Sequence, residues 1–155
     1  MLGNSKTVEI GFAIANDLSQ LADLLTELFE LESDFRPQRD KQLRGLHMIL
    51  NDPALGKLFV LRVGGKVAGM ANALITVSTA EGARVLLLED VIVNKEFRGG
   101  GLGRRLVEHV TAWAREQGMT RITLLADRDN RAALDFYRKL GFADSHMTVL
   151  RKQLS

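Results

Sequence analysis

The spacing of hydrophobic residues along this chain changes several times, and each spacing predicts a different kind of element. Residues 8–14 read as a strand. Apolar residues then recur three or four positions apart over residues 18–29 and again over 43–50, which predicts two helices. Pro53 lies just after the second of these and favours its end. This part of the chain is therefore expected to form one strand and two helices.

Three further apolar runs are separated only by short turns. They cover residues 58–63, 67–77 and 85–93, with Gly64-Gly65 in the first turn and Gly82 in the second. A two-residue glycine turn between strands is typical of a hairpin. The three runs are therefore expected to form an antiparallel meander.

A helical pattern begins at Leu102 and leads to a short apolar run at residues 121–126, which reads as a strand. A strand that follows a crossover helix is expected to lie parallel to the strand before it, here residues 85–93. Both runs are strongly apolar, as expected of parallel strands buried on both faces. Residues 147–150 are expected to complete the sheet. The pattern therefore predicts an α/β chain with a mixed sheet.

Composition narrows the class of protein. The chain has 155 residues, of which 46% are hydrophobic and 26% charged, and these values suit one globular domain over residues 1–155. It has no cysteine, which excludes disulfides and thiolate metal sites and fits a cytoplasmic protein. Its histidines are isolated in sequence, so no metal site is expected. No apolar run reaches the length of a membrane span, so no membrane partner is expected.

Charge is distributed unevenly along the chain. The formal net charge is only +2, but residues 1–34 carry −6 and the remainder carries +8. A basic C-terminal part suits a phosphate-rich cofactor. The basic residues are scattered and no aromatic platform lies among them, which argues against a nucleic-acid partner.

A glycine-rich turn, Arg98-Gly99-Gly100-Gly101-Leu102-Gly103, joins the last strand of the meander to the helix that follows. Glycine lets the backbone adopt positive φ and come close to a ligand. The first N–H groups of a helix lack internal partners and carry partial positive charge, so a turn of this kind forms an anion site. Arg98 adds a cation beside it. The turn predicts a pyrophosphate site, with a solvated tight turn as the alternative.

Two common phosphate-binding motifs do not match this turn. A dinucleotide fingerprint needs a glycine where Arg104 lies, and a nucleotide P-loop needs Lys-Ser or Lys-Thr where Arg104 and Arg105 lie. The pattern that remains is R-x-x-G-x-G.

A second motif covers residues 129–142 and contains Asn130, Ala133 and the run Phe136-Tyr137-x-x-x-Gly141-Phe142. Asp129 or Asn130 can cap a helix here, and Gly141 can end it. In this order and at this spacing, the two motifs resemble those of the GNAT superfamily of acetyl-coenzyme A-dependent N-acetyltransferases. The resemblance covers roughly residues 7–153.

The resemblance implies a fold, a co-substrate and a set of contacts. The fold is a central mixed sheet of about six to seven strands, with an N-terminal antiparallel meander and a central parallel pair, flanked by about four helices. The co-substrate is acetyl-coenzyme A, with no metal. The residues that match cofactor contacts in the family are Val91, Val93, Arg98, Gly99, Gly100, Gly101, Leu102, Gly103, Arg104, Asn130 and Ala133. For Arg104, a solvated helix charge is an equal alternative.

Glu89 is the candidate proton acceptor. An amine is protonated at neutral pH, so a base must take up its proton before it attacks a thioester. Glu89 lies in an otherwise apolar strand, where burial would raise its pKa. The Leu88-Glu89-Asp90-x-x-Val93 pattern resembles the branch of the family that acetylates small polyamines and related amines. Asp90 points to the opposite side of a regular strand and is the reserve candidate, because a bulge could exchange the two faces.

Tyr137 is the candidate acid. By the same resemblance it stands near the coenzyme sulfur, and a phenol can donate a proton to a leaving thiolate. The alternative is a core aromatic on an amphipathic helix. The resemblance also suggests a backbone N–H near Val91 as the donor to the oxyanion.

The acceptor substrate is predicted from an acidic stretch. Glu30, Glu32 and Asp34, with Asp90, are the candidate contacts to a small cationic amine, and a solvated helix face followed by a polar loop is an equal alternative for the acidic stretch. The predicted function is transfer of acetyl to a primary amine by direct attack in a ternary complex. Protein or peptide amines, and a non-catalytic acyl-coenzyme A sensor, remain alternatives. Homodimers are common in the family, but no feature of the sequence identifies an interface.

Overall fold

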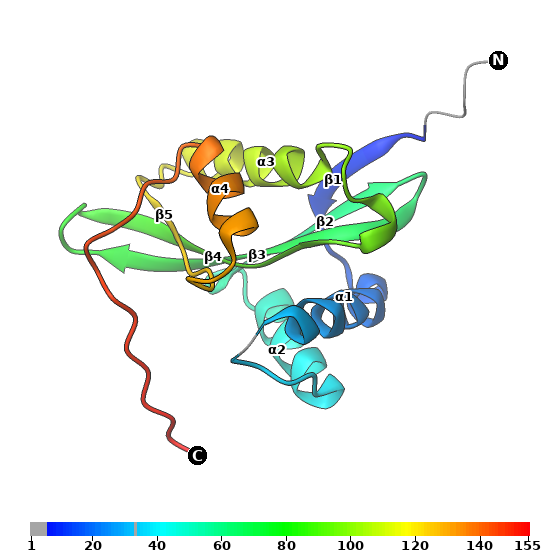
Figure 1. The fold of residues 1–155 in the computed structure, drawn as a ribbon, viewed down its shortest axis with the longest axis horizontal. Coiled ribbons are helices and arrows are strands. Elements are labelled where there is room, and N and C mark those ends of the chain that lie inside the picture. Colours follow the sequence, from blue (N-terminus) through cyan, green and yellow to red (C-terminus); the bar gives the residue numbers. More distant parts are fainter. Residues whose placement is uncertain (1–5, 33) are drawn as a thin grey trace. The chain divides into compact units, whose positions relative to one another are not determined.

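The computed structural model describes residues 6–32 and 34–155, which divide into two compact units. The first ends at Leu125, and the second comprises Ala126–Ser155. Figure 1 shows the ribbon coloured along the sequence.

The first unit is built on one sheet of five strands in the order β1-β2-β3-β4-β5. The strands are β1 (Val8–Phe12), β2 (Gly56–Val63), β3 (Lys66–Ser78), β4 (Ala83–Val93) and β5 (Ile122–Leu124). The first four pair antiparallel, and β5 pairs parallel to β4, with Leu86 opposite Ile122. The predicted meander and the predicted parallel pair are therefore confirmed.

Helices cover both faces of this sheet. In Figure 1, α1 (Leu18–Leu31) and α2 (Arg39–Asn51) lie on one face and α3 (Leu102–Glu116) lies on the other. Two short 3-10 turns, η1 (Ala15–Asp17) and η2 (Lys95–Phe97), precede α1 and follow β4. The mixed α/β class predicted from the sequence is therefore confirmed.

Each face of the sheet has its own apolar layer. Leu21 of α1, Leu46 of α2 and Met70 of β3 are almost completely buried in one cluster. On the other side, α3 buries Leu106 and Val110, which lie four residues apart and so share one face of the helix. Each large side chain buried in this way contributes about 1.5–3 kcal/mol to folding.

A partly buried ion pair supports the start of α1. The side chain of Asp17 is only 6% exposed and accepts hydrogen bonds from Arg62 Nη2 at 2.7 Å and from the backbone N–H of Ile14 at 2.9 Å. Burial by itself would raise the pKa of Asp17, but these two hydrogen bonds outweigh it, so the pKa lies below its usual value. The pair thereby ties η1 to β2.

The sheet is smaller than predicted. Among the residues that the structure describes there are five strands, not six or seven, and residues 147–150 do not form one. Met147 is 87% exposed and Leu150 is 91% exposed, so this segment buries almost none of its apolar surface. Without that burial, a short apolar run has little to offset the entropy of ordering the chain. The expected strand at residues 121–126 is also shorter, since β5 ends at Leu124.

The second unit contains one helix, α4 (Arg131–Lys139). The Asn130 side chain caps it, because its Oδ1 accepts a hydrogen bond from the N–H of Ala133 at 3.1 Å. Gly141 follows the helix with a φ of +97°, a left-handed conformation that glycine adopts without strain. The start and the stop predicted for this helix are therefore confirmed.

Candidate functional site

A bulge interrupts β4 in the middle of the apolar strand. Met70 of β3 pairs with Ile92 and Asn72 pairs with Glu89, so β4 has one more residue than β3 between these two pairs. Asp90 lies in the extra position with a φ of +55°, the one positive φ outside glycine in the described part of the chain. Aspartate tolerates this conformation better than most residues do. The bulge changes where the Asp90 side chain points.

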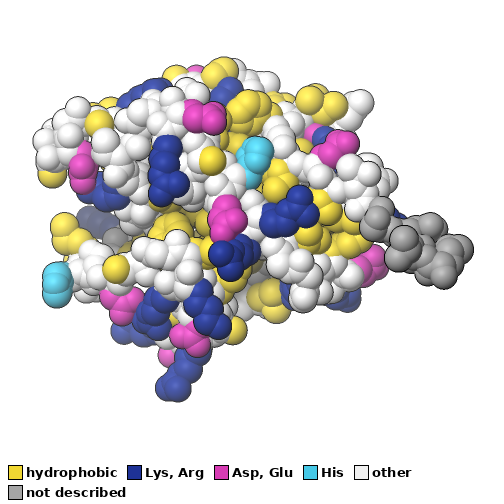
Figure 2. Space-filling view, turned by 90° about the horizontal axis from the view of Figure 1, so that it is seen from above, with side chains coloured by type: hydrophobic (Ala, Val, Ile, Leu, Met, Phe, Trp, Pro, Cys, Tyr) yellow, Lys and Arg dark blue, Asp and Glu magenta, His cyan; other side chains and the backbone are white. Residues whose placement is uncertain are grey.

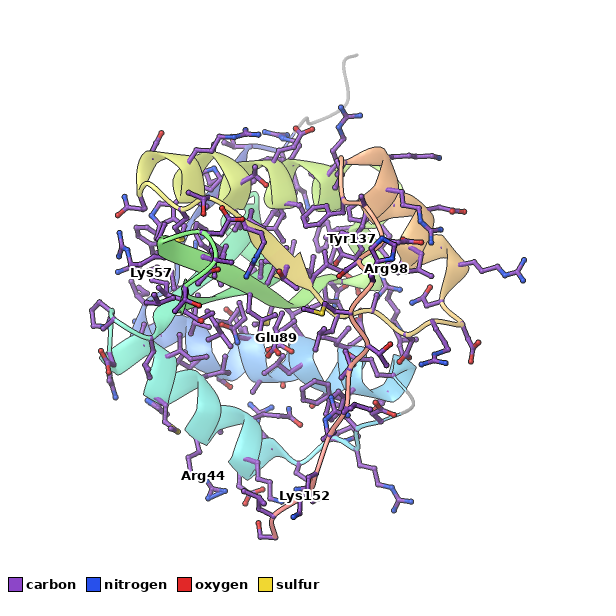
Figure 3. All side chains as sticks on the ribbon, turned by 90° about the vertical axis from the view of Figure 1, so that its left-hand side faces the viewer. Arg44, Lys57, Glu89, Arg98, Tyr137 and Lys152 are labelled. Carbon is purple, nitrogen blue, oxygen red and sulfur yellow. The ribbon has the colours of Figure 1, made fainter. Side chains whose placement is uncertain are left out.

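Both carboxylates of the Glu89-Asp90 pair therefore reach the same side of the sheet. Glu89 is directly opposite Asn72 in an antiparallel pair, so the two side chains share a face. Asn72 Nδ2 donates a hydrogen bond to Asp90 Oδ2 at 3.2 Å, which places Asp90 on that face as well. This is the side covered by α1 (Figure 3). The opposite orientation expected for a regular strand is wrong here because the bulge adds a residue.

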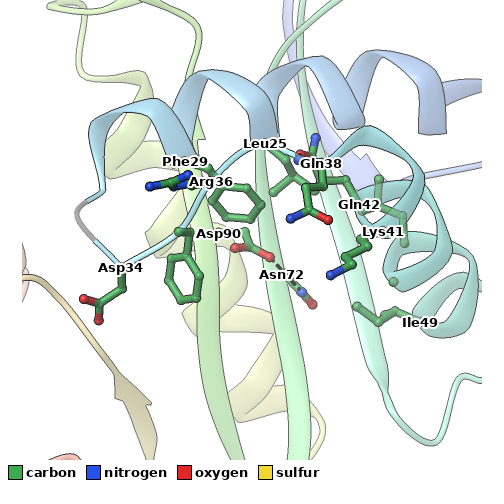
Figure 4. A pocket seen from close by; sticks show the side chains of 13 residues that line it. Leu25, Phe29, Asp34, Arg36, Gln38, Lys41, Gln42, Ile49, Asn72 and Asp90 are labelled. Carbon is green, nitrogen blue, oxygen red and sulfur yellow. Dashed lines mark hydrogen bonds between the residues drawn. The ribbon is translucent and has the colours of Figure 1, made fainter. Parts of the chain in front are cut away.

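A pocket of about 380 Å³ lies on this side of the sheet (Figure 4). Its walls come from α1, α2, the connection between them, and the strands β3 and β4. The residues that line it are Leu25, Phe29, Asp34, Phe35, Arg36, Gln38, Lys41, Gln42, Gly45, Leu46, Ile49, Asn72 and Asp90. This volume is near the lower end of the range for small-molecule sites.

Two polar side chains in this pocket, Asp90 and Asn72, are buried at a cost in free energy. Burial raises the pKa of Asp90 above its usual value, and the hydrogen bond from Asn72 only partly opposes that shift. Asn72 is 4% exposed, and its Oδ1 has no hydrogen-bond partner within the described chain. A buried acceptor without a donor costs free energy, so an amine that enters the pocket can relieve that cost. Perturbed groups in a cleft are typical of functional sites.

Only some of the acidic residues that the sequence analysis proposed line the pocket. Asp34 and Asp90 line the pocket, whereas Glu30 and Glu32 do not. Glu89 is half-buried and is also outside the lining. Asn72 was not singled out in the sequence, although an amide within the apolar run Met70-Ala71-Asn72-Ala73-Leu74 is a signal that could have identified it.

The glycine turn has the backbone geometry of an anion site. Gly99 and Gly101 have φ of +88° and +76°, and Gly101 is the N-cap of α3. The first helical hydrogen bond runs from Arg105 N–H to the Gly101 carbonyl, so the three preceding N–H groups have no helical acceptor. No atom lies within 4 Å of a Cβ built at Gly99, Gly100 or Gly101, so a ligand can approach the backbone there.

The Arg98 side chain is 44% exposed but has partners in β4 and α1. Its Nε donates to the Val93 carbonyl at 2.8 Å, and its guanidinium forms an ion pair with Glu27 of α1. Asn94 Nδ2 also donates to Glu27, at 3.3 Å. Arg98 therefore links α1 to the end of β4, an arrangement that depends on Glu27 and was not foreseen.

Arg104 has a partner on its own helix. Its Nε donates to Glu108 Oε1 at 2.8 Å, and its side chain is 68% exposed. Acidic and basic side chains are interspersed on the α3 side of the molecule (Figure 2). An exposed Arg104 paired with Glu108 of its own helix is the arrangement expected of a solvated helix charge, the alternative considered for Arg104.

The edge of β4 is open beyond the bulge. The pairing with β5 ends at Leu88 opposite Leu124, whereas β4 continues to Val93. Val91 is half-buried and Val93 is buried. Backbone groups of β4 after Leu88 therefore have no ladder partner in β5 within the described residues. Such a free strand edge can accept an extended ligand by strand-like hydrogen bonding.

In the second unit, Tyr137 belongs to an aromatic cluster. Its ring centroid lies 5.1 Å from that of Phe136 and 5.6 Å from that of Phe142. The side chain is half-buried. This packing orders the ring on α4, as either a catalytic or a structural role requires. Ala133 is half-buried near the start of the same helix.

The described residues contain no group of three or more histidine, cysteine, aspartate or glutamate residues that could hold a metal ion. None of the helices described is long and apolar enough to cross a membrane.

The chain belongs to the acetyltransferase (GNAT) family, whose model matches residues 18–142. An uncharacterised N-acetyltransferase from Methanocaldococcus jannaschii is 25% identical over 143 residues, which cover 92% of this chain and 63% of that protein. Glucosamine 6-phosphate N-acetyltransferase from Trypanosoma brucei brucei is 32% identical over 99 residues, which cover 63% of this chain and 65% of that protein. The matches therefore span less than two thirds of the length of these relatives.

A solved structure extends the comparison to the whole fold. An aminoglycoside N-acetyltransferase in complex with coenzyme A superimposes with a TM-score of 0.82, covering 99% of both chains at 19% identity. At this level of identity the likeness establishes the fold only. The resemblance to the GNAT superfamily noted from the sequence is confirmed.

Proposed function

We propose that this chain transfers an acetyl group from acetyl-coenzyme A to the primary amine of a small molecule by direct attack in a ternary complex. One observation carries the proposal. A single stretch of chain, from Glu89 to Gly103, presents two carboxylates on the pocket side of the sheet and then forms the glycine turn that opens α3. An acceptor site and a phosphate site are thereby joined by β4.

The proposed co-substrate site fits the donors that this turn offers. In this proposal the N–H groups of Leu102, Gly103 and Arg104 bind the pyrophosphate, which is supported by their lack of a helical acceptor, and Arg98 holds the turn against α1. The open edge of β4 near Val91 and Val93 is placed to bind the extended arm. When bound, acetyl-coenzyme A supplies the thioester that the amine attacks.

The proposed acceptor chemistry uses the two carboxylates in turn. Asp90 and Asn72 hold the incoming ammonium, and Glu89 takes its proton so that the nitrogen lone pair can attack. The new N–C bond gives a tetrahedral intermediate, and a backbone N–H near Val91 stabilises its oxyanion. The C–S bond then breaks, Tyr137 donates a proton to the leaving sulfur, and the second proton of the attacking nitrogen restores the phenol. Holding both reactants together contributes much of the remaining acceleration.

The nature of the acceptor is supported by the pocket and by the relatives. A volume of about 380 Å³ accommodates a metabolite-sized amine. One of the relatives compared above is named for a small amine-bearing acceptor, a sugar phosphate. A protein amine as acceptor, or a sensor that binds acyl-coenzyme A without turnover, are the competing proposals.

Release of free thiol from acetyl-coenzyme A tests the proposal. We would measure it over a panel of polyamines, aminoglycosides, amino acids, amino sugars and short peptides, with the wild type and with Glu89→Gln and Tyr137→Phe. We expect turnover with one class of small amine, loss of turnover in both variants, and unchanged acetyl-coenzyme A binding by calorimetry. Binding without turnover on any acceptor would favour the sensor instead.

A further inference from the structure

The pocket beside Asp90 has a mixed set of charges. Four ionisable side chains line it, namely Asp34, Arg36, Lys41 and Asp90. Arg36 lies in the connection between α1 and α2, and Lys41 lies in the first turn of α2. Two aspartates and two cations therefore line the pocket, whereas the sequence suggested an acidic acceptor site.

Neighbouring basic residues on α2 have carboxylate partners of their own. Arg39 Nη1 forms an ion pair with Asp23 at 2.5 Å, and Arg44 Nη2 lies 3.9 Å from Asp40. Neither Arg36 nor Lys41 has such a partner among the described residues. The two cations that line the pocket are thus the ones left available for a ligand.

The two cations lie on different sides of the Asp90-Asn72 pair. Figure 4 shows the Lys41 amine on the Asn72 side of the pocket, and Asp34 and Arg36 on the opposite side. Lys41 forms no ion pair with Asp90, although both line the pocket. Apolar side chains, including Phe29, Phe35 and Ile49, form much of the remaining wall. A ligand that spans the pocket meets a carboxylate, an apolar surface and a cation.

We propose that the acceptor is amphoteric, carrying a carboxylate or phosphate that Lys41 binds in addition to the amine that Asp90 and Asn72 hold. This inference rests on the proposed transfer to an amine and names the class of acceptor. A polycation would place positive charge against Lys41 and Arg36, which opposes its binding. An amphoteric molecule complements both signs of charge in the pocket and also fixes the direction in which the amine enters.

Matched acceptors separate the two parts of this inference. Lysine and 1,5-diaminopentane present the same amine with and without a carboxylate, and phosphoethanolamine and ethanolamine do so with and without a phosphate. Thiol release at saturating acetyl-coenzyme A gives kcat and KM for each. We expect kcat/KM to be at least about tenfold higher for the anionic member of at least one pair, since a charge-assisted hydrogen bond is worth that much.

Substitution assigns the preference to residues. In Lys41→Gln we expect KM for the preferred anionic acceptor to rise about tenfold or more, with a smaller change for its uncharged partner and an unchanged KM for acetyl-coenzyme A. Arg44→Gln removes a cation of the same helix that is 63% exposed and does not line the pocket, so it serves as the matched control. Loss of the preference in Lys41→Gln but not in Arg44→Gln supports the inference.

The outcomes distinguish this inference from the proposed function. Turnover with equal or better use of the members that lack an anionic group would overturn the amphoteric acceptor and leave the transferase intact. If no acceptor turns over, calorimetric titration of each pair into the protein saturated with coenzyme A decides the inference. Tighter binding of an anionic member that Lys41→Gln abolishes would support it, and equal or absent binding would overturn it.

Discussion

The two sides of β4 obtain their chemistry in different ways. On the proposed cofactor side, the candidate binding groups are backbone N–H groups of consecutive residues, arranged by glycines at the start of α3. On the acceptor side, the pocket combines residues from α1, α2, β3 and β4 that are far apart in sequence. A site built from backbone depends on local conformation, whereas a site built from distant side chains depends on how the elements pack. Substitutions on the two sides should therefore fail differently.

The largest expected effect is on the acceptor side, in Glu89→Gln. Removing a proton acceptor while keeping the shape of the side chain should lower kcat by about 10²–10⁴-fold. Acetyl-coenzyme A affinity should stay within twofold, because the glycine turn is unchanged. Steady-state kinetics and calorimetry measure the two quantities. A comparable loss in cofactor affinity would show that the two sides are not independent.

On the cofactor side, Gly101→Ala tests the backbone site. Gly101 has a φ of +76°, and a side chain in that conformation costs about 1–2 kcal/mol, which should shift the turn and weaken acetyl-coenzyme A at least about tenfold. Gly118→Ala is the matched control, since Gly118 has a φ of +77° just after the other end of α3. Both variants should lose similar stability, but only the first should lose affinity. Equal affinities would mean that the turn does not bind the pyrophosphate.

Glu27→Gln and Arg98→Gln test the link between the two sides. The ion pair joins α1 to the end of β4, and the Glu27 side chain is 21% exposed. Either variant should lower the free energy of unfolding by about 1 kcal/mol, measured by urea denaturation, with acetyl-coenzyme A affinity within threefold of wild type. A large loss of affinity in Arg98→Gln alone would show that Arg98 also contacts the phosphates.

The smallest expected effect concerns two aspartates with opposite pKa shifts. Burial raises the pKa of Asp90 in the folded state, so ionising it opposes folding as pH rises above the unfolded pKa. Asp90→Asn should therefore raise the melting temperature slightly at pH 7, and this gain should vanish in acid. Thermal unfolding across pH measures it.

Asp17→Asn provides the contrasting case. The pKa of Asp17 is lowered in the folded state, so its contribution to stability is present above the unfolded pKa and is lost as pH falls through the folded pKa. The variant should be less stable than wild type at pH 7, with a difference that shrinks in acid. The same sign for both variants would contradict the assignment of Asp90 as a functional carboxylate and Asp17 as a structural one.

Much of this protein could be predicted from local patterns in the sequence. The turn at residues 98–103, the cap at Asn130 and the stop at Gly141 are conformations that a few adjacent residues determine, so their sequence signals are direct. The meander and the parallel pair also follow from apolar runs and short connections. The expected final strand at residues 147–150 failed because this segment buries almost none of its apolar surface, and without that burial little offsets the entropy of ordering the chain.

The acceptor site was decided by tertiary structure. The bulge that brings Asp90 beside Asn72 depends on how β3 and β4 pair, and no residue pattern within β4 alone specifies it. The same applies to Glu27, which engages Arg98 only because α1 packs near the end of β4. Lys41 and Arg36 line the pocket only because α2 and the connection before it pack over the sheet. Local backbone preferences act between neighbours in sequence, whereas the surroundings of a buried charge are set by contacts between distant segments.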